Sequence, residues 1–304
     1  MTTAFLFPGQ GVDVRAVLRS WCEYSVHVRE LMDAAAQSTG VPFARLAAGG
    51  DHRLTRTEVV QPVLTALVLG IHAELVALGV QPTMLAGHSL GEVAACAASG
   101  CITAADAVAL AALRGRLMAR ESALHPGRML ALSTSDRQLV DSALVVGRER
   151  GYAEVAAHNA PDEWVLSGDV EAIRAIAGRY SATPLPVAGA WHSAAMAGAV
   201  LEFRDAVQAA LSGPIGRPLV SNHTGRVVRE AGELPGLLAR QLVCPVQWVT
   251  TLATLVQSGM HEAIAIGPAK ALGTLARRCA GDALRVRLVQ EPVDLDALVA
   301  TSRA

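Results

Sequence analysis

Several residue types that mark particular classes of protein are scarce in this chain of 304 residues. Lys270 is the only lysine, and 26 basic residues stand against 27 acidic ones, so the chain lacks the positive excess that is typical of nucleic-acid binding. Charged residues make up 17% of the chain, below the about 25% of an average globular protein, while apolar residues reach 52%. This composition excludes a mostly disordered chain and predicts a large buried core.

Cysteine pairs and long apolar runs are scarce as well. The five cysteines are scattered without CxxC spacing, and no His, Cys or Asp cluster has the spacing of metal ligands, so we expect neither disulfides nor a metal. Apolar stretches such as Val63–Ile71 and Val93–Cys101 end before the about 20 residues of a membrane span, and no basic segment precedes Phe5–Phe7. The chain is therefore predicted to be cytoplasmic and free of membrane and bound cofactors.

Most of the chain alternates short apolar runs with longer helical stretches, which is typical of an α/β sheet. Thr3–Phe7 is predicted to be a buried strand that ends in a glycine-containing loop, and Val14–Ala36 a helix. Further along, Thr57–Leu78 is predicted to be helical and Thr83–Ala86 to be a second buried strand. These elements predict a parallel sheet covered by helices.

The pattern of predicted elements changes between about Arg128 and Val187, where short strands and short helices alternate. Their order, βαββαβ, is the ferredoxin-like pattern. The six predicted elements are Met129–Ser133, Ser135–Val146, Glu154–His158, Glu163–Ser167, Val170–Arg179 and Pro184–Val187. We therefore predict a large α/β domain formed by residues 1–124 and 190–304, with a small ferredoxin-like domain, residues 125–189, inserted into it.

The segment Gly87-His88-Ser89-Leu90-Gly91 matches the pattern G-x-S-x-G between a predicted strand and a predicted helix. In such a turn the two glycines let the serine adopt a strained backbone that exposes its hydroxyl above the sheet. The helix that follows offers backbone N–H groups to a developing oxyanion. Ser89 is thus a candidate nucleophile, with an ordinary helix N-cap as the alternative.

A serine nucleophile needs a base, and nine histidines could supply one. His192 lies in a loop after the last strand of the small unit, where it could return to the large domain. His88, next to the candidate nucleophile, is expected to pack or hydrogen-bond locally. The residues alone do not choose between the histidines.

Taken in order, the motifs of this chain resemble the malonyl-CoA:acyl carrier protein transacylase family, which includes the acyltransferase domains of polyketide synthases. The resemblance extends over nearly the whole chain. It is carried by Phe7-Pro8-Gly9-Gln10-Gly11, Gly87-His88-Ser89-Leu90-Gly91-Glu92, Arg114-Gly115, Leu117-Met118, His158-Asn159-Ala160-Pro161, Val165-Leu166-Ser167-Gly168, Gly189-Ala190-Trp191-His192-Ser193, Ser221-Asn222-His223-Thr224-Gly225, Pro245-Val246-Gln247-Trp248 and Ile266-Gly267-Pro268.

The resemblance implies a hydrolase-like large domain and assigns roles to residues. Ser89 would carry the acyl group, and His192 would act as base and then acid, oriented by a backbone carbonyl near Val246–Gln247 rather than by an aspartate. The backbone N–H groups of Gln10 and Leu90 would form the oxyanion hole.

The resemblance also implies substrate-binding residues. Arg114 would pair with the free carboxylate of a malonyl group, with a solvated arginine on a helix face as the alternative. Asn159 would contact substrate or stabilise its loop, and the side chain of Gln10 could cap its turn. Trp191 stands where the family has a smaller residue linked to the choice of α-substituent. It would favour unsubstituted malonyl unless the ring turns outward.

As a function, the resemblance implies transfer of a malonyl or related group from acyl-CoA, through a Ser89 ester, to the phosphopantetheine thiol of an acyl carrier protein. The pathway would be fatty acid or polyketide biosynthesis. Two alternatives keep the same chemistry: a transferase that moves another acyl group between carriers, or an editing hydrolase. A non-catalytic module that docks a carrier protein is a third, which the presence of Ser89, His192 and Gln10 disfavours.

Overall fold

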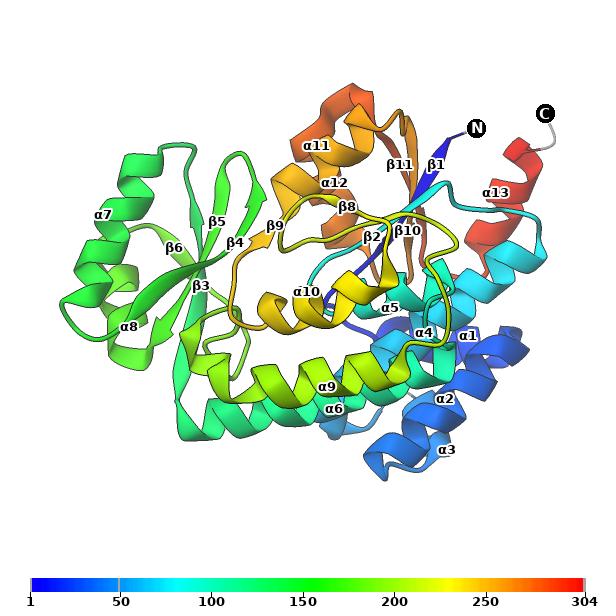
Figure 1. Cartoon of the computed structure of the whole chain (residues 1–304), viewed down its shortest axis with the longest axis horizontal. Helices are drawn as coiled ribbons and strands as arrows, with labels where there is room; N and C mark the ends of the chain where they lie inside the picture. Colours follow the sequence, from blue (N-terminus) through cyan, green and yellow to red (C-terminus); the bar gives the residue numbers. More distant parts are fainter. Residues whose placement is uncertain (1, 49, 303–304) are drawn as a thin grey trace.

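The computed structural model describes residues 2–48 and 50–302, so the predicted outer limits of the large domain, residues 1 and 304, lie outside the described residues. Two β-sheets organise the chain, each with its own helices (Figure 1). The larger sheet carries most of the helices, and the smaller sheet lies to one side with two helices of its own.

The larger sheet has six strands in the order β11-β10-β1-β2-β7-β8. All neighbours run parallel except the short pair β7 and β8. Helices cover the sheet, so its central strands read as continuous apolar segments, and every residue from Ala4 to Phe7 is fully buried. The strands are β1 (Thr3–Phe7), β2 (Met84–Gly87), β7 (Leu219–Val220), β8 (Val227–Val228), β10 (Glu262–Ile266) and β11 (Arg285–Val289).

Two long helices, α4 (Thr57–Ala77) and α6 (Ala104–Leu124), pack against each other beside this sheet. The apolar helix α4 is long enough to cross a bilayer, but 78% of its most apolar window is buried inside the protein, as in a core helix. The other helices of this part are α1 (Arg15–Tyr24), α2 (Val26–Thr39), α3 (Phe43–Ala47), α5 (Gly91–Ser99), α9 (Val200–Ala210), α10 (Leu234–Gln241), α11 (Trp248–Gln257), α12 (Lys270–Ala280) and α13 (Val293–Ser302).

The helix predicted over Val14–Ala36 is wrong as one element, because the chain breaks at Ser25 into α1 and α2. Ser25 has an extended backbone, and its hydroxyl accepts a hydrogen bond from the backbone N–H of Val28. A serine that caps a helix start competes with helix continuation, and here the cap prevails.

The smaller sheet has the strand order β6-β3-β5-β4-β9. Its first four strands alternate with two helices in the ferredoxin-like order that the sequence predicts, and α7 and α8 lie together on one face of this sheet (Figure 1). Its elements are β3 (Gly127–Ser133), α7 (Arg137–Arg148), β4 (Ala153–Ala160), β5 (Glu163–Asp169), α8 (Val170–Arg179), β6 (Ala182–Pro184) and β9 (Val246–Gln247). Leu130, Val140, Leu166 and Ile176 belong to a core separate from that of the larger sheet.

Two details of the smaller sheet differ from expectation. Strand β6 ends at Pro184, whereas the sequence predicts a strand that begins there, because Ala182–Pro184 pairs with β3. The fifth strand, β9, comes from a distant part of the chain and extends β4 in parallel. The domain limits 124/125 and 189/190 stay a prediction.

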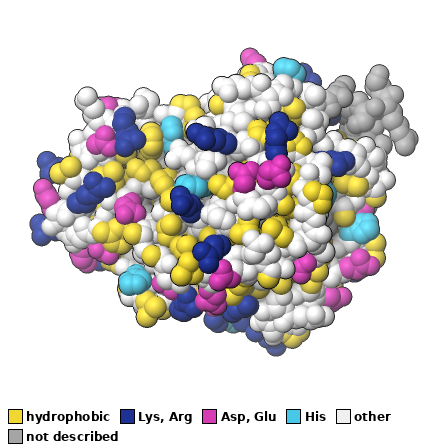
Figure 2. Space-filling model, in the orientation of Figure 1, with side chains coloured by type: hydrophobic (Ala, Val, Ile, Leu, Met, Phe, Trp, Pro, Cys, Tyr) yellow, Lys and Arg dark blue, Asp and Glu magenta, His cyan; other side chains and the backbone are white. Residues whose placement is uncertain are grey.

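The topology brings several loops to one place. Strands β1 and β2 are parallel neighbours, with Phe7 opposite Gly87, so the loops that follow them leave the same edge of the sheet side by side. Ligands of α/β sheets bind at this carboxyl edge. On the face in Figure 2, basic and acidic side chains are interspersed, as the near-zero net charge leads one to expect.

Candidate active site

Ser89 lies in a sharp turn between β2 and α5, with a backbone φ of 50°. The flanking glycines make this turn possible, because a Cβ on Gly87 would lie 2.0 Å from the carbonyl carbon of Gly91, and one on Gly91 would lie 2.1 Å from the backbone oxygen of Phe7. No side chain fits at either position. The G-x-S-x-G spacing therefore has a packing reason as well as a conformational one.

Backbone strain concentrates on two residues. Within residues 2–48 and 50–302, Ser89 and His192 are the only residues other than glycine with positive φ, at 50° and 57°. Such conformations cost free energy and are found at active sites, where the surrounding structure holds them in place. The two strained residues are also the candidate nucleophile and the candidate base.

The hydroxyl of Ser89 and Nε2 of His192 are 2.7 Å apart. On the other side of the ring, Nδ1 lies 2.7 Å from the backbone carbonyl oxygen of Gln241. A carbonyl only accepts, so Nδ1 carries the proton, and Nε2 is free to accept the proton of Ser89. This arrangement suits proton abstraction from the serine.

The prediction that a backbone carbonyl near Val246–Gln247 orients His192 is wrong, because the backbone carbonyl of Gln241 does so. Val246 and Gln247 form β9 and pair with β4. Gln241 ends α10, and the last carbonyls of a helix have no partner within the helix, so this one can serve His192.

Burial and the nearby positive charge of Arg114 lower the pKa of His192 to about 3, against a smaller opposing effect of the Gln241 carbonyl. His192 is 6% exposed. His192 is therefore neutral at pH 7, which is the form that a general base requires.

Arg114 is fully buried on α6, so the alternative of a solvated arginine is wrong. Its Nη1 donates to the side-chain oxygen of Gln61 (3.1 Å), and its Nη2 donates to Oε1 of Gln241 (2.9 Å) and to the hydroxyl of Ser89 (3.2 Å). Its Nε is buried and has no hydrogen-bond partner in the described part of the chain. Burial lowers the pKa of Arg114 to about 10, so it stays a cation at pH 7 beside the serine.

Gln10 and Leu90 lie on the two adjacent loops that follow β1 and β2. These loops are in close contact, because a Cβ on Gly9 would lie 2.7 Å from the backbone oxygen of His88. The side chain of Gln10 is engaged elsewhere: its Oε1 accepts from the hydroxyl of Thr57 (2.7 Å) on α4. The glutamine thereby anchors its loop, which leaves its backbone N–H as the group that could serve an oxyanion.

A cavity of about 270 Å³ lies at the serine and is lined by Gln10, Ser89, Arg114, Asn159, Trp191 and His192, among others. Trp191 is 7% exposed, and its indole N–H donates to the hydroxyl of Ser122 (3.3 Å). The same tryptophan lines a second cavity of about 480 Å³. Gln10, Pro186 and Val187 line both cavities as well, so the two spaces adjoin at Trp191 and these residues.

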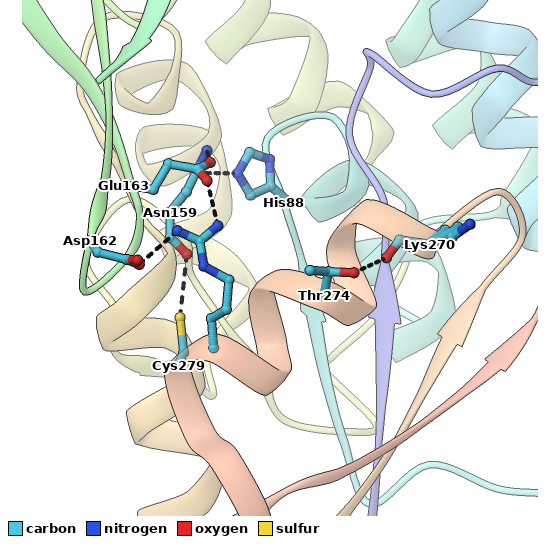
Figure 3. A network of polar contacts seen from close by, with 8 residues as sticks. His88, Asn159, Asp162, Glu163, Lys270, Thr274 and Cys279 are labelled. Carbon is cyan, nitrogen blue, oxygen red and sulfur yellow. Dashed lines mark hydrogen bonds and ion pairs between the residues drawn. The ribbon is translucent and has the colours of Figure 1, made fainter. Parts of the chain in front are cut away.

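Asn159 connects the nucleophile turn to the small sheet (Figure 3). Its Oδ1 lies 2.9 Å from Nε2 of His88, and its Nδ2 donates to Oε1 of Glu163 (3.3 Å). Glu163 and Asp162 both pair with Arg278 on α12. Both ends of the Asn159 amide are engaged, which favours the alternative of a residue that stabilises its loop. The hydrogen bond of His88 is not local, because Asn159 lies 71 positions away in the chain.

A larger cleft of about 650 Å³ adjoins the cavity at Ser89 and shares Gly11, Val12, Glu163, Ala271 and Leu275 with it. Among residues 2–48 and 50–302, no three His, Cys, Asp or Glu side chains are grouped so that they could hold a metal ion.

Sequence reasoning missed three polar residues that hold the site together: Gln61, Glu92 and Gln241. All three are fully buried. Their signal in the sequence was a polar residue within an otherwise apolar helical face, which marks a buried group that must find a partner. The partner itself could not be identified without the fold.

Comparison with known proteins finds one matching family model and several similar proteins. The family model described as "Acyl transferase domain" matches residues 4–232. The malonyl CoA-acyl carrier protein transacylase of Mycobacterium tuberculosis is 33% identical over 97% of this chain and 98% of its own length, and that of Bacillus subtilis is 28% identical over 98% and 96%. The polyketide biosynthesis protein ThaF of Burkholderia thailandensis is 33% identical, and the matched region is 24% of that protein.

Solved structures of malonyl-CoA:acyl carrier protein transacylases are similar to this chain over nearly its whole length. The crystal structure of MCAT from Mycobacterium tuberculosis superimposes with a TM-score of 0.90 at 32% identity, over 98% of this chain and all of that one. The malonyl-CoA:ACP transacylase of Synechocystis superimposes with a TM-score of 0.89 at 28% identity, over 98% and 100%.

Proposed function

Because the chain belongs to the malonyl-CoA:acyl carrier protein transacylase family of acyltransferases, we propose that it moves a malonyl group from coenzyme A to an acyl carrier protein through an ester on Ser89. The pathway is the synthesis of fatty acids or polyketides, as the names of its relatives suggest. The observation that carries the proposal is a buried cation, Arg114, next to a serine–histidine pair.

In the first half-reaction Ser89 attacks the thioester carbonyl, and His192 takes the hydroxyl proton at Nε2. The C–S bond breaks, His192 returns the proton to the leaving thiolate, and coenzyme A departs as the free thiol with the malonyl group left as an ester on Ser89. The Gln241 carbonyl holds the protonated Nδ1 and so keeps the ring in place.

In the second half-reaction the phosphopantetheine thiol of the carrier replaces coenzyme A. His192 takes the thiol proton, the sulfur attacks the ester carbonyl, and the proton returns to Ser89 as the ester C–O bond breaks. No other cofactor takes part in these steps. The adjoining cleft offers a route for the pantetheine arm, and Lys270 on its wall offers a cation for the phosphate of that arm or for an acidic carrier. Arg278 on the same wall is already paired with Asp162 and Glu163.

Two groups of donors bind negative charge: one stabilises the oxyanion that forms during the reaction, and the other binds the carboxylate that the substrate already carries. The backbone N–H groups of Gln10 and Leu90 serve the oxyanion, and each well-aimed donor is worth about 3 kcal/mol. Arg114 takes the malonyl carboxylate, and Trp191 closes the cavity on the side of the α-carbon, so that unsubstituted malonyl fits best.

The other transferase and hydrolase readings would use the same Ser89 and His192. The comparisons favour malonyl transfer, and a buried arginine without a ligand carboxylate would be a costly feature of a site for neutral acyl groups. A cytoplasmic location is part of the proposal.

The test is intact-protein mass spectrometry after exposure to malonyl-, methylmalonyl- or acetyl-CoA. We expect a malonyl adduct on the wild-type protein and on the control Ser135→Ala, whose serine is exposed in the small domain, but none on Ser89→Ala. Addition of a carrier protein bearing phosphopantetheine should then move the malonyl mass to the carrier.

Other outcomes point elsewhere. A malonyl adduct that persists on Ser89→Ala excludes Ser89 as the acylated residue. An adduct that is lost to water as fast with the carrier as without it indicates the editing hydrolase. Loading only from acyl carriers, and never from coenzyme A, indicates the carrier-to-carrier transferase.

A further inference from the structure

Gln241 contacts the candidate base and the candidate carboxylate-binding residue through different atoms. Its backbone carbonyl accepts from Nδ1 of His192. Its side chain points to the other partners: Oε1 accepts from Nη2 of Arg114 (2.9 Å), and Nε2 donates to the backbone oxygen of Ser89 (3.0 Å) and to Oε2 of Glu92 (2.5 Å). The main chain and the side chain of this residue therefore have separable roles.

The partners fix which way the Gln241 amide faces. An arginine only donates, so Oε1 must face Arg114, while the oxygens of Glu92 and of the Ser89 carbonyl accept, so the NH₂ must face them. With Gln241 and Gln61 on its two terminal nitrogens, the guanidinium has one orientation in the site. Its Nε is buried and has no hydrogen-bond partner within the described residues.

Glu92 accepts the hydrogen bond of the Gln241 side-chain NH₂ group. It is fully buried in the first turn of α5, and burial raises its pKa to about 7. The Gln241 amide, Ser221, the backbone N–H of Asn222 and the charge of Arg114 oppose that rise. Glu92 is thus an acidic group coupled to Arg114, with the Gln241 amide between them, and it offsets part of the cost of burying that cation.

We propose that the Gln241 side chain, anchored by Glu92, is a positioning group that selects carboxylated acyl groups by fixing the direction in which Arg114 presents its N–H groups. The inference rests on the proposed function, in which Arg114 binds the malonyl carboxylate. Because the carbonyl that serves His192 belongs to the main chain, a change of the side chain affects substrate selection more than base orientation.

The experiment compares single-turnover loading of malonyl and acetyl groups from coenzyme A, read by intact mass, in the wild type, Gln241→Met, Glu92→Met and Gln138→Met. The last is an exposed glutamine on α7 and serves as the control. We expect the malonyl-to-acetyl ratio of kcat/KM to fall about tenfold in Gln241→Met, mainly through a higher KM for malonyl-CoA. It should fall in the same direction in Glu92→Met and stay unchanged in Gln138→Met.

A double-mutant cycle separates positioning from a general structural effect. In an Arg114→Met background, Gln241→Met should change the ratio no further, because the guanidinium on which it acts is gone. A further fall as large as in the wild-type background overturns the proposal, and so does an equal loss of malonyl and acetyl loading in Gln241→Met.

If Gln241→Met does not fold, Gln241→Glu gives a second test. Its carboxylate would pair with Arg114 and compete with the substrate, so the ratio should again fall, and an unchanged ratio contradicts the proposal. Loading of the wild type by malonyl-CoA is the separate check on the proposed function. A wild type that takes no malonyl refutes that function, whereas normal wild-type loading with an unchanged ratio in Gln241→Met refutes only the positioning role.

Discussion

Arg114→Met is the perturbation that tests the proposed substrate selection most directly. Methionine keeps much of the side-chain volume on α6 and removes the charge. In the free protein the guanidinium donates to Gln61, Gln241 and Ser89. A malonyl carboxylate would add charge-assisted hydrogen bonds to it, which contribute about 1.5–3 kcal/mol when one partner is charged.

Loss of that contribution corresponds to a fall of about 10- to 150-fold in kcat/KM for malonyl-CoA. Acetyl-CoA has no carboxylate to lose, so the malonyl-to-acetyl ratio should fall by a similar factor. The charge of Arg114 also holds the pKa of His192 down, second to burial, so the pKa of His192 should be higher in this variant.

The assay is the rate of adduct formation with each thioester, followed by rapid quenching and intact-protein mass spectrometry. Arg116→Met is the matched control, since Arg116 is an exposed arginine on the same helix. A malonyl-to-acetyl ratio that is the same in Arg114→Met as in the wild type refutes the assignment of Arg114. An equal fall in Arg116→Met would show that the effect comes from net charge rather than from a contact.

Four further predictions concern packing and titration. Gly91→Ala should lower the free energy of unfolding by at least about 2 kcal/mol in urea titrations, because the added methyl group meets backbone atoms. In Gly178→Ala the methyl group meets open space, so the free energy of unfolding should change by no more than about 1 kcal/mol. Equal effects of the two substitutions would contradict the packing argument. Trp191→Ala should join two cavities and raise methylmalonyl relative to malonyl loading about tenfold or more, and an unchanged ratio would show that the ring is not the limiting wall. Because the pKa of His192 is lowered to about 3, the acylation rate should show no fall centred near pH 6.5 between pH 8 and 5. Burial also lowers the pKa of His72, to about 4. Below about pH 6.5 the unfolded chain binds protons at His72 and His192 that the folded chain does not, so each histidine should lower the free energy of unfolding by about 2 kcal/mol at pH 5. Urea titrations at pH 7 and pH 5 would measure this loss.

Features that depend on a few consecutive residues could be predicted. The buried strand Thr3–Phe7, the strand–turn–helix around Ser89 and the order of elements in the small sheet follow from apolar runs, glycines and periodicity, all of which act over short distances along the chain. The break at Ser25 was missed because a helix cap and a helix interior differ by one side-chain hydrogen bond.

The amino-acid sequence alone thus determined the strained turn that presents Ser89, the α/β class and, by resemblance, the family. Only the tertiary structure decided which groups meet there. His192 lies 103 positions from Ser89 in the chain and Gln241 lies 127 positions from Arg114, so their contacts depend on how helices and loops pack around the sheet edge. The fold also decided that Arg114 is buried, since its helix could have turned that side chain to water. Local backbone preferences depend on neighbouring residues in the chain. Burial, charge pairing and the pKa of His192 depend on atoms that only the folded chain brings together.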